Sequence, residues 1–197
     1  MSDPGSDPQS VSNPQYWADR YAEGTARWDL GGPCPVFVHL LSSPQAPPPG
    51  RVAFPGCGSG HDVGYWREQG YDAVGFDFAV QAEDPPIENL DVFDLGRRHP
   101  ESFDTIVEYT CYCAIDPARR PEYAASLHTA LKPGATLVAL LFPVEHKPEG
   151  PPYGVSEDEI QQVLGADLEL LHFSTPTQSA EGREGRERLA IFRKPGA

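Results

Sequence analysis

The sequence predicts an α/β fold, a three-layer sandwich in which helices cover both faces of a mainly parallel sheet. Short apolar segments typical of strands alternate with segments of helical periodicity over most of the chain. A glycine-rich loop also follows the first of these strands and opens directly into a helix. The 197 residues fit one domain. We place this domain at residues 14–197 and expect the polar residues 1–13 to form a disordered tail.

The first half of the chain supplies two helices before the first strand. Aromatic side chains one helical turn apart, at Trp17 and Tyr21, begin the ordered pattern, and residues 36–41 are predicted as a short apolar helix. Residues 51–54 are then predicted as a strand, residues 62–69 as a helix and residues 73–76 as a second strand. In the next segment, residues 78–89, Pro85 and Pro86 limit any helix to little more than one turn at 79–83.

The second half continues the alternation. Residues 105–107 are predicted as a strand, and residues 121–131 as a helix that Lys132-Pro133-Gly134 stops. Residues 135–142 are predicted as a buried strand. A capping pattern that starts at Ser156 predicts a helix over 156–164. Residues 167–173 and 188–193 are predicted as two final strands around a polar hairpin.

Charge and composition exclude several classes of protein. The chain has 15 Lys+Arg and 29 Asp+Glu, a net charge of −14, which argues against binding nucleic acid or anionic lipid. No apolar run approaches the roughly 18 residues of a membrane-spanning helix, and the first residues lack the features of a secretory signal. The cysteines have no spacing typical of a zinc site, so we expect a reduced cytoplasmic protein without a metal. They are Cys34, Cys57, Cys111 and Cys113.

Residues 56–60, Gly-Cys-Gly-Ser-Gly, carry the most informative motif. Alternate glycines let the backbone turn sharply and let a flat ligand approach the main chain. The next strand ends at Asp77, where nucleotide-binding α/β proteins place the carboxylate that binds ribose hydroxyls. The spacing differs from the GxGxxG of dinucleotide sites, and Asp62 would repel a pyrophosphate but suits a sulfonium or an ammonium. The loop favours S-adenosylmethionine over NAD, with a tight turn that binds no ligand as the structural alternative.

Several further stretches resemble one protein family. On these motifs the chain resembles the thiopurine S-methyltransferase family of class I methyltransferases, and residues 108–115 lean toward its thiol and halide branch. The resemblance covers about residues 15–193. It implies a Rossmann-like, seven-stranded sheet with an antiparallel last strand, and S-adenosylmethionine as the cofactor. The motifs are Tyr16-Trp17, Tyr21, Trp28-Asp29 and residues 54–58 (FPGCG), 74–77 (VGFD), 91–95 (DVFDL), 103–109 (FDTIVEY), 113–117 (CAIDP), 131–134 (LKPG) and 150–153 (GPPY).

The resemblance also implies which residues bind the cofactor. Aromatic side chains would cover its methionine end, the glycine loop would make main-chain contacts, and an aspartate would hold the ribose. Two residues would flank the adenine, and a tyrosine would line the junction with the acceptor. The aromatic residues are Trp17, Tyr21 and Trp28, and the loop residues are Gly56, Cys57 and Gly58. Asp77 would hold the ribose, Asp91 and Val92 would flank the adenine, and Tyr109 would line the junction. Packing on the core stays an alternative for Trp17 and Tyr21. Asp91 is preferred to Asp94, and Glu108 could be only an edge carboxylate.

The implied chemistry is in-line transfer of a methyl group to a small soft nucleophile, namely a thiol, a thiopurine-like thiol, a halide or a chalcogen anion. Such a nucleophile needs little help from a general base, and no histidine or lysine base falls inside the motifs. We assign no catalytic residue and keep only Tyr109 as a positioning candidate. Buried cysteines ordinarily behave as small hydrophobic residues. The acidic surface slightly favours neutral or zwitterionic thiols.

Two other functions stay open at this stage. A cofactor-binding homologue with little or no catalysis would share the same motifs, and the short segment 78–89 would give it a thin adenine pocket. An NAD-dependent oxidoreductase has little support, because GxGxxG is absent. Family members are commonly small monomers. We therefore expect a monomer that acts on a small-molecule acceptor, with no nucleic acid or membrane partner.

Overall fold

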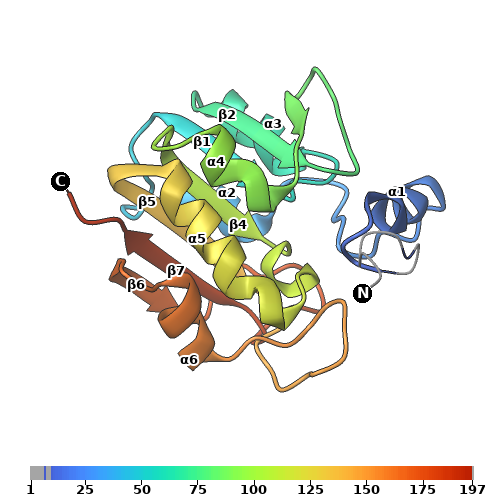
Figure 1. Ribbon diagram of the computed structural model, residues 1–197. Coiled ribbons are helices and arrows are strands. Elements are labelled where there is room, and N and C mark those ends of the chain that lie inside the picture. Colours follow the sequence, from blue (N-terminus) through green and yellow to red (C-terminus); the bar gives the residue numbers. More distant parts are fainter. Residues whose placement is uncertain (1–6, 8–9, 197) are drawn as a thin grey trace.

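Seven strands form one sheet in the order β3-β2-β1-β4-β5-β7-β6 in the computed structural model, which describes residue 7 and residues 10–196 (Figure 1). Strands β1 to β5 pair in parallel, whereas β7 is antiparallel to both β5 and β6. The predicted mainly parallel sheet with an antiparallel last strand is confirmed. The strands are β1 (Arg51–Pro55), β2 (Asp72–Asp77), β3 (Ile87–Asn89), β4 (Phe103–Tyr109), β5 (Leu131–Leu141), β6 (Glu169–Ser174) and β7 (Arg188–Arg193).

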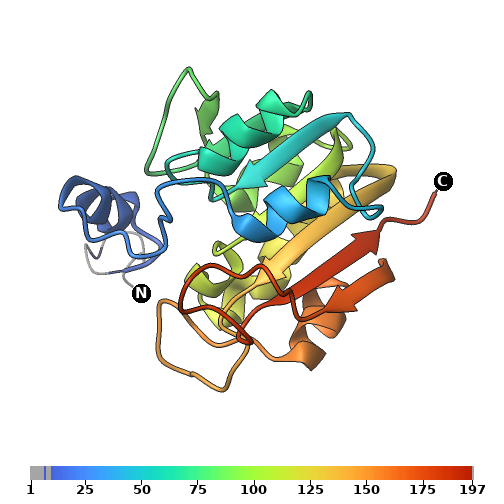
Figure 2. The ribbon, with the colours of Figure 1, turned by 180° about the vertical axis from the view of Figure 1, so that it is seen from behind.

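Helices cover both faces of this sheet, as the three-layer prediction requires. Helices α2 (Pro35–Leu41) and α3 (His61–Glu68) lie on one face, and α4 (Leu95–Arg98), α5 (Arg120–Ala130) and α6 (Glu157–Glu159) lie on the other (Figures 1 and 2). Neighbouring residues of a strand enter different cores: Val52 and Phe54 pack with α2 and α3, whereas Ala53 packs with α4 and α5. This alternation follows from the two-residue period of a strand.

Helix α1 (Pro14–Ala22) stands away from the sheet in both views (Figures 1 and 2). Asn13 caps it by accepting from the backbone N–H of Gln15 at 2.9 Å, and a proline occupies its first turn. Its only fully buried residue is Tyr16. Most of the tail predicted to be disordered, residues 1–6 and 8–9, lies outside the described residues, so that expectation stays a prediction.

The segment between β2 and β3 contains no helix, in keeping with the limit set by its two prolines. Instead the chain turns, and Ala82 forms an isolated bridge with Ile87. Strand β3 was not predicted, because three residues are too few to show a strand period. It also missed α4, which has only four residues.

The remaining elements fall close to their predicted bounds. Helix α5 ends at Ala130, and β5 begins at Leu131, four residues before its predicted start. The register against β4 shifts at that point, and regular pairing resumes at Thr136. The helix predicted over 156–164 is present as α6, which continues through a π turn at Ile160–Leu164. Since β1, β2 and β4 are parallel, they end at one edge of the sheet.

Candidate active site

The glycine loop after β1 has a backbone that only glycine adopts without strain. Gly56, Gly58 and Gly60 have φ of 63°, 52° and 76°, in the left-handed region. The loop is also crowded, because a Cβ on Gly56 would lie 2.6 Å from Cys111 Sγ. A Cβ on Gly58 would collide with the Tyr21 hydroxyl. The loop therefore lies directly under α1 and against the turn that follows β4.

Asp77, at the end of β2, is held by this loop. Its carboxylate accepts the backbone N–H groups of Gly58 at 2.9 Å, Ala79 at 2.8 Å and Val80 at 3.2 Å. The side chain is 7% exposed, and burial raises its pKa. A carboxylate has about four acceptor positions, so about one remains for a ligand hydroxyl. Asp77 thus both fastens the loop and faces the adjoining cavity.

A cavity of about 570 Å³ lies between the N-terminal segment and the edge of the sheet. Its walls come from α1 and the loop after it, the ends of β1, β2 and β4, and the loops near residues 142–152 and 181–186. Seven of the predicted cofactor residues line it, namely Trp17, Tyr21, Trp28, Gly56, Asp77, Asp91 and Val92. Beside the short segment 78–89, the side chains of Phe78 and Phe93 also line this cavity.

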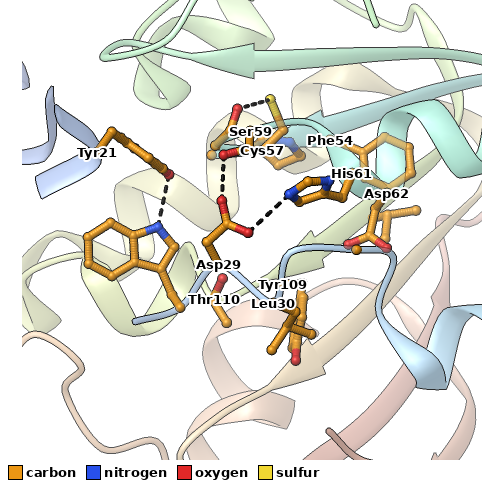
Figure 3. Close-up of a pocket in the computed structure, with 16 residues that line it drawn as sticks. Tyr21, Asp29, Leu30, Phe54, Cys57, Ser59, His61, Asp62, Tyr109 and Thr110 are labelled. Carbon is orange, nitrogen blue, oxygen red and sulfur yellow. Dashed lines mark hydrogen bonds and ion pairs between the residues drawn. The ribbon is translucent and has the colours of Figure 1, made fainter. Parts of the chain in front are cut away.

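A smaller pocket of about 60 Å³ adjoins this cavity and is lined by the other three predicted residues, Cys57, Gly58 and Tyr109 (Figure 3). The two spaces share wall residues, among them Tyr21 and Thr110. The pocket lies over the ends of β1 and β4. All ten predicted residues therefore gather at one edge of the sheet.

Polar contacts fasten the N-terminal segment to the glycine loop (Figure 3). Asp29 accepts from the Ser59 hydroxyl at 2.5 Å and lies 3.1 Å from His61 Nε2. Asp62, on the opposite wall, accepts the backbone N–H of Cys34 at 2.7 Å, and burial raises its pKa to about 6. His61 thus helps to hold the N-terminal segment against the glycine loop.

The aromatic side chains of the N-terminal segment face the cavity rather than the core. The Trp28 ring lies 5.2 Å from that of Trp17 and 5.6 Å from that of Tyr21, both edge to face. Trp28 Nε1 donates to the Tyr21 hydroxyl at 2.9 Å (Figure 3). Trp17 and Tyr21 belong to neither core cluster. Both side chains line the larger cavity; their contact with the cofactor stays a prediction.

Asp91 and Asp94, the two aspartates considered as cofactor ligands, lie in different surroundings, and Glu108 in a third. Asp91 lines the larger cavity, whereas Asp94 pairs with Arg97 on the surface. Glu108 is fully buried and faces neither space: it accepts the N–H groups of Cys111 at 3.1 Å and Tyr112 at 2.8 Å, and the Tyr123 hydroxyl at 2.5 Å. Burial raises its pKa to about 7. Glu108 therefore supports the turn after β4, at the carboxyl end of that strand.

Sequence reasoning missed two residues of the hairpin before β7. The Arg183 side chain is 6% exposed, lines the larger cavity, and donates to the Tyr109 hydroxyl and to the Trp28 carbonyl, the latter at 3.1 Å. The Tyr109 hydroxyl donates to Glu187 Oε1 at 3.1 Å, and Glu187 is fully buried. The available signal was the run of arginines at 183, 186 and 188 in an otherwise acidic chain.

Other kinds of site are not found in the described part of the chain. There, no group of three or more His, Cys, Asp or Glu side chains is arranged to hold a metal ion. All four cysteines are free thiols. Of the helices formed by residues 10–196, none has the length and apolar character needed to cross a bilayer.

Comparison with known sequences adds to this geometry. The profile of the family described as thiopurine S-methyltransferase matches residues 12–88 and 80–193. Probable thiol methyltransferase 2 of Arabidopsis thaliana is 34% identical over 191 residues, covering 90% of this chain and 84% of that protein. Thiocyanate methyltransferase 1 of Brassica oleracea is 31% identical with the same coverage. A thiopurine S-methyltransferase of Legionella pneumophila (strain Corby) is 28% identical, covering 74% of this chain and 77% of that protein.

Solved structures share the fold at lower identity. The 1,6-didemethyltoxoflavin-N1-methyltransferase of Burkholderia thailandensis, solved with S-adenosylhomocysteine, superposes with a TM-score of 0.77 at 19% identity and covers 99% of this chain and 92% of that one. A TehB-like S-adenosylmethionine-dependent methyltransferase of Corynebacterium glutamicum gives 0.63 at 20% identity, with coverages of 92% and 97%.

Proposed function

The chain belongs to the thiopurine S-methyltransferase family of S-adenosylmethionine-dependent methyltransferases, and we propose that its methyl acceptor is a small sulfur nucleophile that reacts as an anion. The observation that carries this proposal is the buried guanidinium of Arg183 in the wall of the larger cavity. The names of two relatives, a thiol and a thiocyanate methyltransferase, describe acceptors of this class.

The residues at the edge of the sheet fit the cofactor. Gly56 of the glycine loop lines the larger cavity, Asp77 keeps an acceptor position, and Asp91 and Val92 line the same cavity. We assign the ribose to Asp77, the adenine to Asp91 and Val92, and the methionine end to the aromatic group of Trp17, Tyr21 and Trp28. When bound, the cofactor supplies an electrophilic methyl group on a sulfonium. The protein's own part is to position the acceptor and to exclude water.

The charge of the cavity supports an anionic acceptor. Five arginines and four acidic residues line it, a small local excess of positive charge in a chain with 15 basic and 29 acidic residues. The arginines are Arg20, Arg27, Arg119, Arg183 and Arg186. Arg183 differs from the exposed pairs at the rim because no carboxylate of the described residues lies within ion-pair distance of it. Local charge at the reacting atoms outweighs the net charge of −14, which alone had favoured neutral thiols.

The cysteines in the wall do not compete as nucleophiles. Burial raises the pKa of Cys113 to about 12 and that of Cys111 well above its usual value. Both therefore remain protonated near neutral pH and act as small apolar side chains. No lysine or histidine lines the larger cavity among the described residues. An acceptor that already carries its negative charge suits such a wall.

A methyl-transfer assay tests this proposal. The protein with S-adenosylmethionine labelled on its methyl group is offered thiocyanate, an aliphatic thiol and, as a hard nucleophile of similar size, an alcohol. We expect transfer to the first two and none to the third. Binding of S-adenosylhomocysteine by calorimetry without transfer to either sulfur compound would contradict the proposal.

The variant Arg183→Gln tests whether the buried guanidinium of Arg183 binds the acceptor. We expect the KM for thiocyanate to rise about tenfold, because a charge-assisted contact is worth about 1.5–3 kcal/mol. The affinity for S-adenosylhomocysteine should change less than about twofold. Arg193→Gln, an exposed arginine at the end of β7, is the matched control. An equal rise of KM in the control would show that long-range charge, and not contact with Arg183, attracts the anion.

Three broader expectations belong to the same proposal. We propose a single domain over residues 14–197, a monomer in solution, and a cytoplasmic location. The free cysteines support the last of these, because a reducing compartment keeps thiols unpaired. Sedimentation of the purified protein checks the second.

A further inference from the structure

We infer that Glu187, acting through the Tyr109 hydroxyl, takes up the proton of a thiol acceptor while Arg183 holds the resulting thiolate; this inference rests on the proposed function. It adds a proton acceptor to a site in which the sequence shows none. It also separates two kinds of acceptor, since a thiol must lose a proton before it reacts and thiocyanate has none to lose.

The hydrogen bonds form a continuous path. Arg183 Nη1 donates to the Tyr109 oxygen, and Tyr109 donates its own proton to Glu187 Oε1 at 3.1 Å. Arg183 is at the same time part of the wall of the larger cavity. The phenol therefore stands between a cation that faces the acceptor and a carboxylate that does not.

Glu187 is placed to hold a proton. Its side chain is 0% exposed, and its Oε2 has no hydrogen-bond partner among the described residues. Burial raises the pKa of this carboxyl, and Glu184 adds to the effect, while Tyr109 and Arg183 oppose it. Ser179, which lies beside it, also favours the charged form. A buried carboxylate with an unmade hydrogen bond accepts a proton more readily than one in water.

The remaining neighbour of the path does not compete for the proton. Cys34 faces the Tyr109 hydroxyl from the start of α2, and burial raises its pKa to about 12. Its thiol therefore stays protonated. Burial likewise raises the pKa of Tyr109 far above the neutral range, so the phenol passes a proton on without remaining ionised.

The step conserves both atoms and buried charge. The S–H bond of the acceptor breaks and its proton goes to the Tyr109 oxygen, as the phenol proton moves to Glu187 Oε1. The electron pair left on sulfur forms the new C–S bond, while the bond between the methyl carbon and the sulfonium breaks. Before the proton moves, the negative charge lies on Glu187, which Tyr109 separates from Arg183; afterwards it lies on the thiolate that Arg183 holds. The proton later returns through Tyr109 to water.

Paired acceptors test this inference. Transfer to 2-mercaptoethanol and to thiocyanate is measured at pH 7 and pH 10 in the wild type and in Glu187→Gln, whose amide oxygen can still accept from Tyr109. We expect kcat/KM for the thiol at pH 7 to fall about 100-fold, a typical effect of losing a general base. Thiocyanate should lose less than about twofold. At pH 10, where the thiol is ionised in solution, the thiol defect should shrink to about threefold or less.

Two further variants keep the test decisive. Tyr109→Phe breaks the path at its middle and should reproduce the same pattern even if Glu187→Gln folds poorly. Glu169→Gln, the same change at an exposed position of β6, should leave both acceptors unaffected. Equal losses with both acceptors, or an unchanged thiol rate, would overturn the inference. So would a wild type that uses thiocyanate and no thiol. A wild type that uses neither acceptor refutes the proposed function itself, and this is seen before any variant is made.

Discussion

Two parts of the cavity wall, to which we assign the cofactor and the acceptor, differ in how they are built. The glycine loop and Asp77 are local in sequence, whereas Arg183 and its partners lie far apart along the chain. On the cofactor side, Asp77 binds Gly58, only 19 positions away, and both belong to one strand-loop-helix-strand unit. On the acceptor side, Arg183 bonds Tyr109 across 74 positions and Trp28 across 155. A local unit leaves a pattern in the sequence, and an assembly of distant side chains does not.

The two sides also differ in charge and in tolerance to change. The three glycines of the loop, Gly56, Gly58 and Gly60, have no room for a Cβ, so their contribution lies in backbone shape. The part that we assign to the acceptor carries the buried charge of Arg183, and each partner of this guanidinium can be substituted separately. We therefore expect substitutions of the loop to abolish function together with stability, and substitutions around Arg183 to change acceptor preference.

Gly56→Ala should give the largest effect. The added Cβ meets Cys111 Sγ at 2.6 Å and the backbone has φ of 63°, so strain and overpacking together should cost about 3–5 kcal/mol of unfolding free energy. Cofactor binding should be lost. Gly24→Ala is the control, because φ there is 65° with no atom within 4 Å, and it should cost about 1 kcal/mol. Denaturant unfolding measures both, and equal costs would show that φ alone matters.

Glu108→Gln should reveal the cost of a charge at the turn where the two sides meet. Burial raises the pKa of Glu108 from 4.5 to about 7 in the folded protein. Below about pH 4.5 the carboxyl is neutral in both states. As pH rises to 7 only the unfolded chain ionises freely, so wild-type stability falls by about 3 kcal/mol relative to the variant.

Unfolding measured from pH 4.5 to 8 checks this expectation. The glutamine variant should be the more stable protein above pH 7 and should have lost the corresponding part of the pH dependence. Glu68→Gln, on the exposed side of α3, should keep the wild-type profile. A variant with an undiminished slope would mean that other buried carboxyls, such as Asp62, cause the effect.

Asp77→Ala should weaken binding of S-adenosylhomocysteine by about 2–3 kcal/mol, since it removes a charge-assisted contact to a ribose hydroxyl and frees the loop that the carboxylate fastens. Asp77→Asn, which keeps one acceptor oxygen, should lose less. Asp72→Asn, at the exposed opposite end of β2, is the control. Calorimetry gives the affinities, and an unchanged value for the alanine variant would remove Asp77 from the cofactor site.

The smallest expected effect is that of the bond between Trp28 and Tyr21. Trp28→Phe and Tyr21→Phe each remove the 2.9 Å hydrogen bond and should each reduce cofactor affinity by about 1 kcal/mol. The double variant should lose no more than either single one, which gives a coupling of about 1 kcal/mol. Strictly additive losses would mean that the two rings contact the ligand independently.

Much of the fold could be predicted because its signals are local. The strand at β1, the glycine loop and the helix α3 follow from a short apolar run, three glycines and helical spacing. The crossover at 78–89 was predicted to lack a full helix from two prolines, and it does. The exceptions, β3 and α4, are too short to show a period, so only pairing with β2 and packing on α5 stabilise them.

The sequence by itself determined six of the seven strands, the cofactor and the ten residues that gather at the edge of the sheet, because each belongs to a segment whose backbone geometry is fixed by neighbouring residues. Tertiary structure decided the rest. It buried Glu108 beneath a turn, and it brought Arg183 and Glu187 to Tyr109. Such contacts form when the hairpin before β7 folds back over the ends of β4 and β5. Because the residues that it brings together lie far apart in the sequence, they show no periodic pattern that could predict the contact.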